Sequence, residues 1–232
     1  MKEKIYLIPG LMCDDRLWKR IKPYLENTYE LVHLEIPLTS NFDEIIKILD
    51  ERIKEDKINL FGFSFGAYIA SYYAVKHPNK VKRLFLNAGT PSVMTEKEIE
   101  KRNKMLEMMN NFGFQGISSK KVASLLEETN QNDEDMISTI KNMYSDLGKD
   151  VYISQMKTIN NRIPLENDLI HLNIPIKMFY STNDRLLNYK SLDNFTEKHT
   201  HITKICRVGT SHMIPLEMPK LLSEEIISWM NT

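Results

Sequence analysis

The chain has 232 residues, enough for one large domain or for one domain that carries a sizeable insertion. Hydrophobic residues make up 42% of it and charged residues 27%, a composition typical of a globular protein rather than a disordered or fibrous one. Its 31 basic residues balance its 31 acidic ones, which argues against a nucleic-acid-binding protein or a polybasic membrane protein.

Strand-like and helix-like stretches alternate along most of the chain, which predicts an α/β fold with a mostly parallel sheet and helices on both faces. We expect about six strands, which are Ile5–Ile8, Glu30–Leu34, Ile58–Phe63, Val81–Asn87, Ile176–Ser181 and Ile202–Val208. The helices expected around this sheet are Asp15–Leu25, Asp43–Lys54, Phe65–His77, Asn188–Lys198 and Pro219–Met230.

One long stretch breaks this alternation, because no convincing strand lies between Asn87 and Ile174. Roughly eighty residues of amphipathic helix between two parallel strands are too many for a simple connection. We therefore predict a helical cap at residues 91–172, inserted before the penultimate strand, and a core formed by residues 1–90 and 173–232. The expected cap helices are Glu96–Phe112, Lys120–Thr129, Glu134–Leu147 and Val151–Arg162.

A serine lies between a predicted strand and a predicted helix, within Gly62-Phe63-Ser64-Phe65-Gly66. Gly-x-Ser-x-Gly in this context is typical of a nucleophile elbow, a turn so tight that it leaves the serine strained and exposed. The pattern by itself also occurs in ordinary turns. The bulky side chains of Phe63 and Phe65 favour the elbow, because aromatic residues are poor choices for a plain solvent turn.

A carboxylate and an imidazole each follow a predicted strand farther along the chain. Asp184 comes shortly after the fifth predicted strand, and His212 comes shortly after the sixth. Open parallel sheets form their sites beyond the carboxyl ends of strands, so we expect both side chains near Ser64. The order Ser, Asp, His predicts a nucleophile, an orienting acid and a general base. Asp193 is an alternative acid, but it falls inside a predicted helix.

A serine nucleophile also requires N–H donors for the oxyanion that develops on the substrate. We expect one from Phe65, which follows Ser64 and opens a helix. We expect the other from Leu11, in the loop after the first strand, where Gly10 lets the backbone approach a ligand closely. The alternative is a Pro9-Gly10 turn without a role in catalysis.

In chain order, Pro9-Gly10-Leu11, Gly62-Phe63-Ser64-Phe65-Gly66, Asn183-Asp184 and Ser211-His212-Met213 resemble the α/β-hydrolase superfamily, specifically its small capped bacterial carboxylesterases. The resemblance covers nearly the whole chain and is weakest over Asn103–Tyr144. It implies the α/β-hydrolase fold and the triad and oxyanion roles named above. Similar members include pimeloyl-carrier-protein methyl esterases of biotin synthesis, general carboxylesterases and lyases of menaquinone synthesis.

The chain departs from this family's pattern at three positions. Pro9 stands where many members have histidine, Ser211 where most have glycine before the catalytic histidine, and Ser181 where many begin the acid loop with glycine. None of these departures removes a catalytic group. They therefore bear on the subfamily more than on the chemistry.

These features predict a serine hydrolase that cleaves a carboxylic ester of a small or acyl-chain substrate through an acyl-enzyme. Such a mechanism needs neither a metal nor an organic cofactor. A thioesterase or a lyase on the same triad is an alternative within catalysis. A ligand-binding receptor or pseudoenzyme with slow turnover is an alternative from another class.

The cap supplies candidates for substrate and partner contacts. Met105, Met109 and Met143 could line an acyl pocket, because methionine adapts to varied apolar ligands, although plain helix packing is the alternative. Basic side chains such as Lys101 and Arg102 could meet an acidic acyl carrier protein. Interleaved glutamates make a solvated helix face the competing interpretation.

The sequence also bounds where the protein is expected to act. No apolar run approaches the length of a membrane span, and the chain enters its first strand without room for a signal peptide. Its two cysteines, Cys13 and Cys206, are too few for a disulfide framework or a metal cluster. We expect a cytoplasmic protein.

Overall fold

A computed structural model describes residues 2–195 and 199–232, and these form a six-stranded sheet in the order β2-β1-β3-β4-β5-β6. Every pair of neighbouring strands is parallel. The predicted α/β fold class is thereby confirmed. The strands are β1 (Glu3–Ile8), β2 (Tyr29–His33), β3 (Ile58–Phe63), β4 (Val81–Asn87), β5 (Ile176–Ser181) and β6 (Ile202–Arg207).

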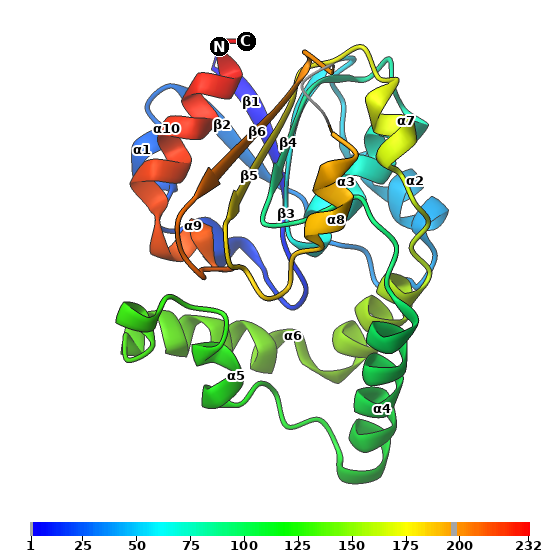
Figure 1. The fold of residues 1–232 in the computed structure, drawn as a ribbon, viewed down its shortest axis with the longest axis vertical. Helices are drawn as coiled ribbons and strands as arrows, with labels where there is room; N and C mark the ends of the chain where they lie inside the picture. Colours follow the sequence, from blue (N-terminus) through cyan, green and yellow to red (C-terminus); the bar gives the residue numbers. More distant parts are fainter. Residues whose placement is uncertain (1, 196–198) are drawn as a thin grey trace.

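Helices cover both faces of the sheet (Figure 1). One face carries α1 (Lys22–Leu25) and α10 (Pro219–Met230), and the other carries α2 (Phe42–Arg52), α3 (Phe65–Lys76) and the short α8 (Tyr189–Asp193). Because both faces are covered, β3 does not alternate between buried and exposed residues, and all six of its residues are buried. The carboxyl end of β3 is thus fixed inside the core, which gives the site a rigid base.

Two of the helices predicted around the sheet differ from the observed ones. The stretch Asp15–Leu25 divides into a 3₁₀ turn η1 (Asp15–Trp18) and the separate helix α1. Pro23 explains the break, because it has no N–H to continue a helix from the preceding turn and is tolerated only in the first turn of α1. The helix expected at Asn188–Lys198 is shorter, since α8 ends at Asp193; residues 196–198 lie outside the described residues.

Between β4 and β5 the chain forms helices only, and we call residues 88–175 the insertion. Figure 1 shows α4, α5 and α6 below the sheet, at the carboxyl ends of the strands. The division of the chain at residues 90 and 172 into a core and a cap stays a prediction. The insertion's elements are α4 (Glu96–Phe112), α5 (Ser119–Ala123), η2 (Glu128–Asn130), α6 (Glu134–Asn160) and α7 (Glu166–Ile170).

The long helix α6 replaces two predicted helices. Its two halves match Glu134–Leu147 and Val151–Arg162 closely, and they meet at Gly148, which has φ 76° and ψ −172°. This non-helical residue bends α6, so that its halves follow different directions (Figure 1). The predicted helix Lys120–Thr129 was too long, because α5 ends at Ala123. In the described part of the chain, no helix has the length and apolar character needed to cross a membrane.

Candidate active site

The turn between β3 and α3 holds Ser64 in a strained conformation. Its φ of 53° and ψ of −112° lie outside the regions that non-glycine residues ordinarily adopt. A Cβ on Gly62 would lie 2.3 Å from the carbonyl oxygen of Gly66, and a Cβ on Gly66 would lie 2.3 Å from the carbonyl oxygens of Ile8 and Pro9. Glycine at both positions is therefore a steric requirement of the turn, as the nucleophile-elbow prediction expects.

The loops after β5 and β6 bring Asp184 and His212 to Ser64. The imidazole Nδ1 of His212 lies 2.7 Å from Oδ2 of Asp184, and its Nε2 lies 2.9 Å from Oγ of Ser64. Asp184 is 2% exposed and His212 is 6% exposed, whereas Ser64 is only half-buried. The three predicted residues thus form one continuous hydrogen-bonded chain that ends at an accessible hydroxyl.

The carboxylate of Asp184 determines which nitrogen of His212 can act as a base. Since Asp184 can only accept when ionised, Nδ1 of His212 is the protonated nitrogen and donates to it. Nε2 is then free to accept the hydroxyl proton of Ser64. The second oxygen of Asp184 accepts the N–H of Leu186 at 2.9 Å, which fixes the carboxylate in place.

The alternative acid, Asp193, lies elsewhere. It is the exposed last residue of α8, and its side chain has no hydrogen bond to His212. The geometry therefore groups Asp184, rather than Asp193, with the serine and the histidine.

Two backbone N–H groups beside Ser64 have no acceptor among residues 2–195 and 199–232. They belong to Leu11, in the loop after β1, and to Phe65, the first residue of α3. The neighbouring N–H groups of that loop are occupied, since Met12 donates to Oε1 of Gln155 at 2.8 Å and Cys13 donates to the carbonyl of Gly10 at 3.1 Å. Leu11 and Phe65 are the two donors that the sequence predicted for an oxyanion, and this role stays a prediction.

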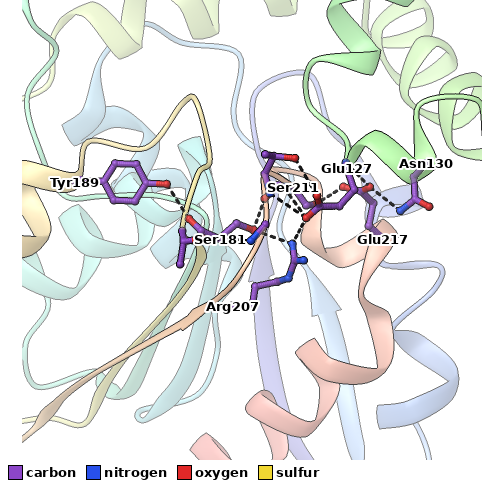
Figure 2. Close-up of polar contacts among 10 residues, drawn as sticks. Glu127, Asn130, Ser181, Tyr189, Arg207, Ser211 and Glu217 are labelled. Atoms are coloured by element: carbon purple, nitrogen blue, oxygen red, sulfur yellow. Dashed lines mark hydrogen bonds and ion pairs between the residues drawn. The ribbon is translucent and has the colours of Figure 1, made fainter.

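Sequence reasoning missed a second set of polar residues, which supports the loop of His212 (Figure 2). Glu127 of the insertion accepts the N–H groups of Thr210 and Ser211, at 3.0 and 3.1 Å, and pairs with Arg207. Glu217 accepts the hydroxyl proton of Ser211 and the N–H of Glu127, the latter at 2.8 Å. Two carboxylates therefore join the histidine loop to the insertion.

These two carboxylates have opposite pKa shifts. Burial alone raises the pKa of Glu127, but hydrogen bonds from Arg207 and from the Thr210 and Ser211 amides outweigh it and lower the pKa to about 2. Burial raises the pKa of Glu217, and the neighbouring charge of Glu127 adds to this effect. The stronger set of donors is thus concentrated on Glu127.

Two of the departures from the family pattern belong to this network. The hydroxyl of Ser211 donates to Glu217, and the hydroxyl of Ser181 donates to the carbonyl of Ser211 at 2.6 Å. The sequence gives one indication of this network: serine stands at two positions where the resemblance predicts glycine. Their partners could not be named from sequence, because Glu127 is 84 residues away from Ser211.

The predicted pocket methionines occupy different environments. Met109 is 6% exposed and packs with Met12 and Met156, next to the loop of Leu11. Met143 is fully buried, and Met105 is 41% exposed on α4. A role in substrate binding stays a prediction for all three.

Residues 35–219 match the family described as the alpha/beta hydrolase fold, which is most of the chain. The chain belongs to the α/β-hydrolase family. This assignment agrees with the parallel sheet, the elbow after β3 and the Ser-Asp-His order along the chain.

Named members of the α/β-hydrolase family resemble the chain at different levels. Over 202 residues it is 24% identical to a pimeloyl-[acyl-carrier protein] methyl ester esterase of Wigglesworthia glossinidia brevipalpis, covering 80% of this chain and 76% of that protein. Over 98 residues it is 30% identical to the protein of the same name from Legionella pneumophila (strain Paris), covering 40% of each. A thermophilic esterase from Thermogutta terrifontis superposes with a TM-score of 0.85 at 17% identity, covering 100% of this chain and 90% of that one.

Proposed function

We propose that the protein is a serine hydrolase that cleaves carboxylic esters through an acyl-enzyme. The observation that carries this proposal is the hydrogen-bonded chain from Asp184 through His212 to Ser64, beside two N–H groups that find no acceptor in the described part of the chain. A base within hydrogen-bond reach of a serine, itself oriented by a carboxylate, is what activates a hydroxyl as a nucleophile. The names of the curated relatives, which are esterases, also support it.

In the proposed mechanism each residue has one step. His212 Nε2 takes the hydroxyl proton while Ser64 Oγ bonds to the ester carbonyl carbon, and the N–H groups of Leu11 and Phe65 stabilise the oxyanion. The carbon–alkoxy bond then breaks, and the alcohol leaves with the proton from His212. Water, deprotonated by His212, attacks the acyl-enzyme, and the acid is released as Ser64 regains its proton.

For the substrate, we propose an acyl chain that carries an ester, presented by an acyl carrier protein. Both curated relatives carry that substrate in their names. Two features of the chain are compatible with it: Met109, an adaptable apolar side chain, lies beside the loop of Leu11, and Lys101 is exposed on α4. We also propose that residues 91–172 act as a cap over this substrate.

A nitrophenyl ester assay tests the reaction type. We expect a burst of nitrophenol followed by steady turnover, and we expect Ser64→Ala to abolish both. An acyl thioester of the same chain length, measured in parallel, separates the alternatives. Faster turnover of the thioester would make the protein a thioesterase, and the absence of any burst or turnover with either compound would favour the ligand-binding alternative.

A further inference from the structure

The insertion contributes a buried hydrogen bond to the loop that precedes the predicted oxyanion donor. Gln155, in the second half of α6, is 4% exposed, and its Oε1 accepts the N–H of Met12 at 2.8 Å. Met12 is fully buried and has a φ of 53°, a left-handed conformation that is uncommon for a side chain of this size. A strained residue keeps such a conformation only when its surroundings hold it, and Gln155 is one of the groups that do so.

This bond determines which N–H of the loop remains available. Because Gln155 occupies the N–H of Met12, the donor that has no acceptor among the described residues is the N–H of Leu11, one residue earlier. The side chain of Met12 also packs against Met109, Tyr152 and Met156 of the insertion. The loop is therefore held from the insertion both by a hydrogen bond and by packing.

The loop of His212 depends on the insertion in the same way. Four consecutive backbone N–H groups, from Thr210 to Met213, donate to it: the first two to Oε1 of Glu127, and the last two to the carbonyl of Leu125 at 2.9 and 3.4 Å. The hydroxyl of Thr210 adds a bond to Oε2 of Glu127 at 2.9 Å. A buried backbone needs such partners, and here the insertion provides them.

We propose that Gln155 and Glu127 are positioning residues, through which the insertion sets the oxyanion donor and the general base relative to Ser64. This inference rests on the proposed hydrolase function. It gives the insertion a part in the chemistry as well as in substrate recognition. Substitutions at these two residues should lower kcat more than they raise KM, because they move catalytic groups that act in the transition state.

Gln155→Met tests the first half of the proposal. The change keeps the volume of the side chain and removes the acceptor for Met12. We expect kcat for nitrophenyl butyrate to fall by about ten- to a hundredfold with KM within about threefold, since a small displacement of an oxyanion donor has effects of this order. Lys157→Met, at an exposed position of the same helix, is the matched control and should leave both constants unchanged.

Glu127→Gln and Glu127→Leu test the second half. The amide of glutamine can still accept from Thr210 and Ser211, whereas leucine leaves these N–H groups without a partner and Arg207 without its carboxylate. We therefore expect kcat to decrease from wild type to the glutamine variant and further to the leucine variant. Glu128→Gln, an exposed neighbour in η2, is the control.

Folding and function are separated by two further readouts on each variant. Melting temperature and circular dichroism report whether the protein is folded, and the rate at which a nitrophenyl phosphonate labels Ser64 reports the nucleophile and the oxyanion donors together. Folded Gln155→Met and Glu127→Gln proteins with wild-type kcat and labelling rates would overturn the inference. A wild-type protein that labels normally but turns over no ester would overturn the proposed function alone, and the labelling rates of the variants would still decide the inference.

Discussion

The turn of Ser64 and the loop of His212 are both parts of one site, yet they are held in different ways. The turn is fixed by its own backbone, because Gly62 and Gly66 pack against carbonyl oxygens only 2.3 Å from where a Cβ would be. The loop of His212 is fixed by residues of the insertion, which accept four of its N–H groups. The proposed nucleophile is thus held by its local backbone, whereas the proposed base is held by tertiary contacts.

The turn and the loop should therefore respond differently to substitution. A change in the turn acts on Ser64 directly and does so through steric overlap with the core, so it should affect folding first. A change in the insertion leaves the sheet and the turn intact, so it should affect the position of His212 first. The following experiments test this contrast.

The largest effect is expected at the triad itself. Ser64→Ala and His212→Ala should each lower kcat by about 10⁴- to 10⁶-fold, and the double variant should be little worse, because triad members act as one unit. The measurement is single- and double-variant kinetics on one nitrophenyl ester. Independent, multiplicative losses would show that the two residues do not cooperate as the 2.9 Å contact implies.

The next largest effect is expected at the proposed orienting acid. Asp184→Asn should lower kcat by roughly 10³- to 10⁴-fold, because an amide in place of the carboxylate stabilises the wrong imidazole tautomer. Asp193→Asn is the matched control at the end of α8 and should retain activity. If the two variants exchanged these outcomes, the acid would be Asp193 despite its distance from the hydrogen-bonded chain.

Because the turn of Ser64 is held by its own backbone, a substitution of its glycines should lower the stability of the fold. Gly66→Ala should lower the unfolding free energy by about 3 kcal/mol or more, since the added methyl group meets backbone that cannot move aside. Gly116→Ala is the control: its φ of 67° is also left-handed, but no atom lies within 4 Å of the new Cβ, so we expect about 1 kcal/mol. Chemical denaturation of both variants gives the comparison, and equal losses would contradict the steric argument.

The different ways in which the turn and the loop are held also explain what could be predicted from the sequence. The turn is encoded in five consecutive residues, and the strands and helices beside it follow from apolar periodicity, so the fold class and the positions of Ser64, Asp184 and His212 were accessible. Pro23 and Gly148 changed helix boundaries that periodicity alone had set. The first break is predictable from the sequence, because proline lacks an N–H and cannot continue a helix from the preceding turn.

The residues that support the two loops could not be predicted from the sequence. Glu127 lies in the stretch predicted as the helix Lys120–Thr129, and Gln155 lies in α6; nothing in their local sequence distinguishes them from solvated neighbours such as Glu128. Their partners are 84 and 143 residues away, and only the fold brings them together. Buried hydrogen bonds between distant segments are thus the part of this site that required the structure.

A pH titration of stability should separate the two carboxylates that support the loop of His212, Glu127 and Glu217. The lowered pKa of Glu127, about 2 against an ordinary 4.5, means that its charged form stabilises the fold above about pH 4.5 and that this contribution is lost as the pH falls towards 2. Wild type should therefore lose more unfolding free energy on acidification than Glu127→Gln does. The raised pKa of Glu217 has the opposite sign, because its ionisation opposes folding as the pH rises past 4.5. Glu217→Gln should accordingly steepen the acid loss, and parallel curves for all three proteins would contradict both shifts.

The smallest effect, counted per methylene of the substrate, concerns the apolar side chains of the insertion. If Met109 lines an acyl pocket beside the loop of Leu11, kcat/KM should rise by up to about fourfold per added methylene across acetyl, butyryl and hexanoyl esters, which corresponds to about 0.8 kcal/mol each. Met109→Gln should flatten this rise, and Met143→Gln should do the same if that buried side chain also faces the acyl chain. Met105→Gln, at a side chain that is 41% exposed, should flatten it least.

Plain packing predicts another result, in which Met109→Gln lowers the melting temperature and leaves the chain-length profile unchanged. Because the profile is a ratio of rates within one variant, it is insensitive to the fraction of folded protein, and a wild-type preference for acetyl over all longer chains would exclude the acyl pocket.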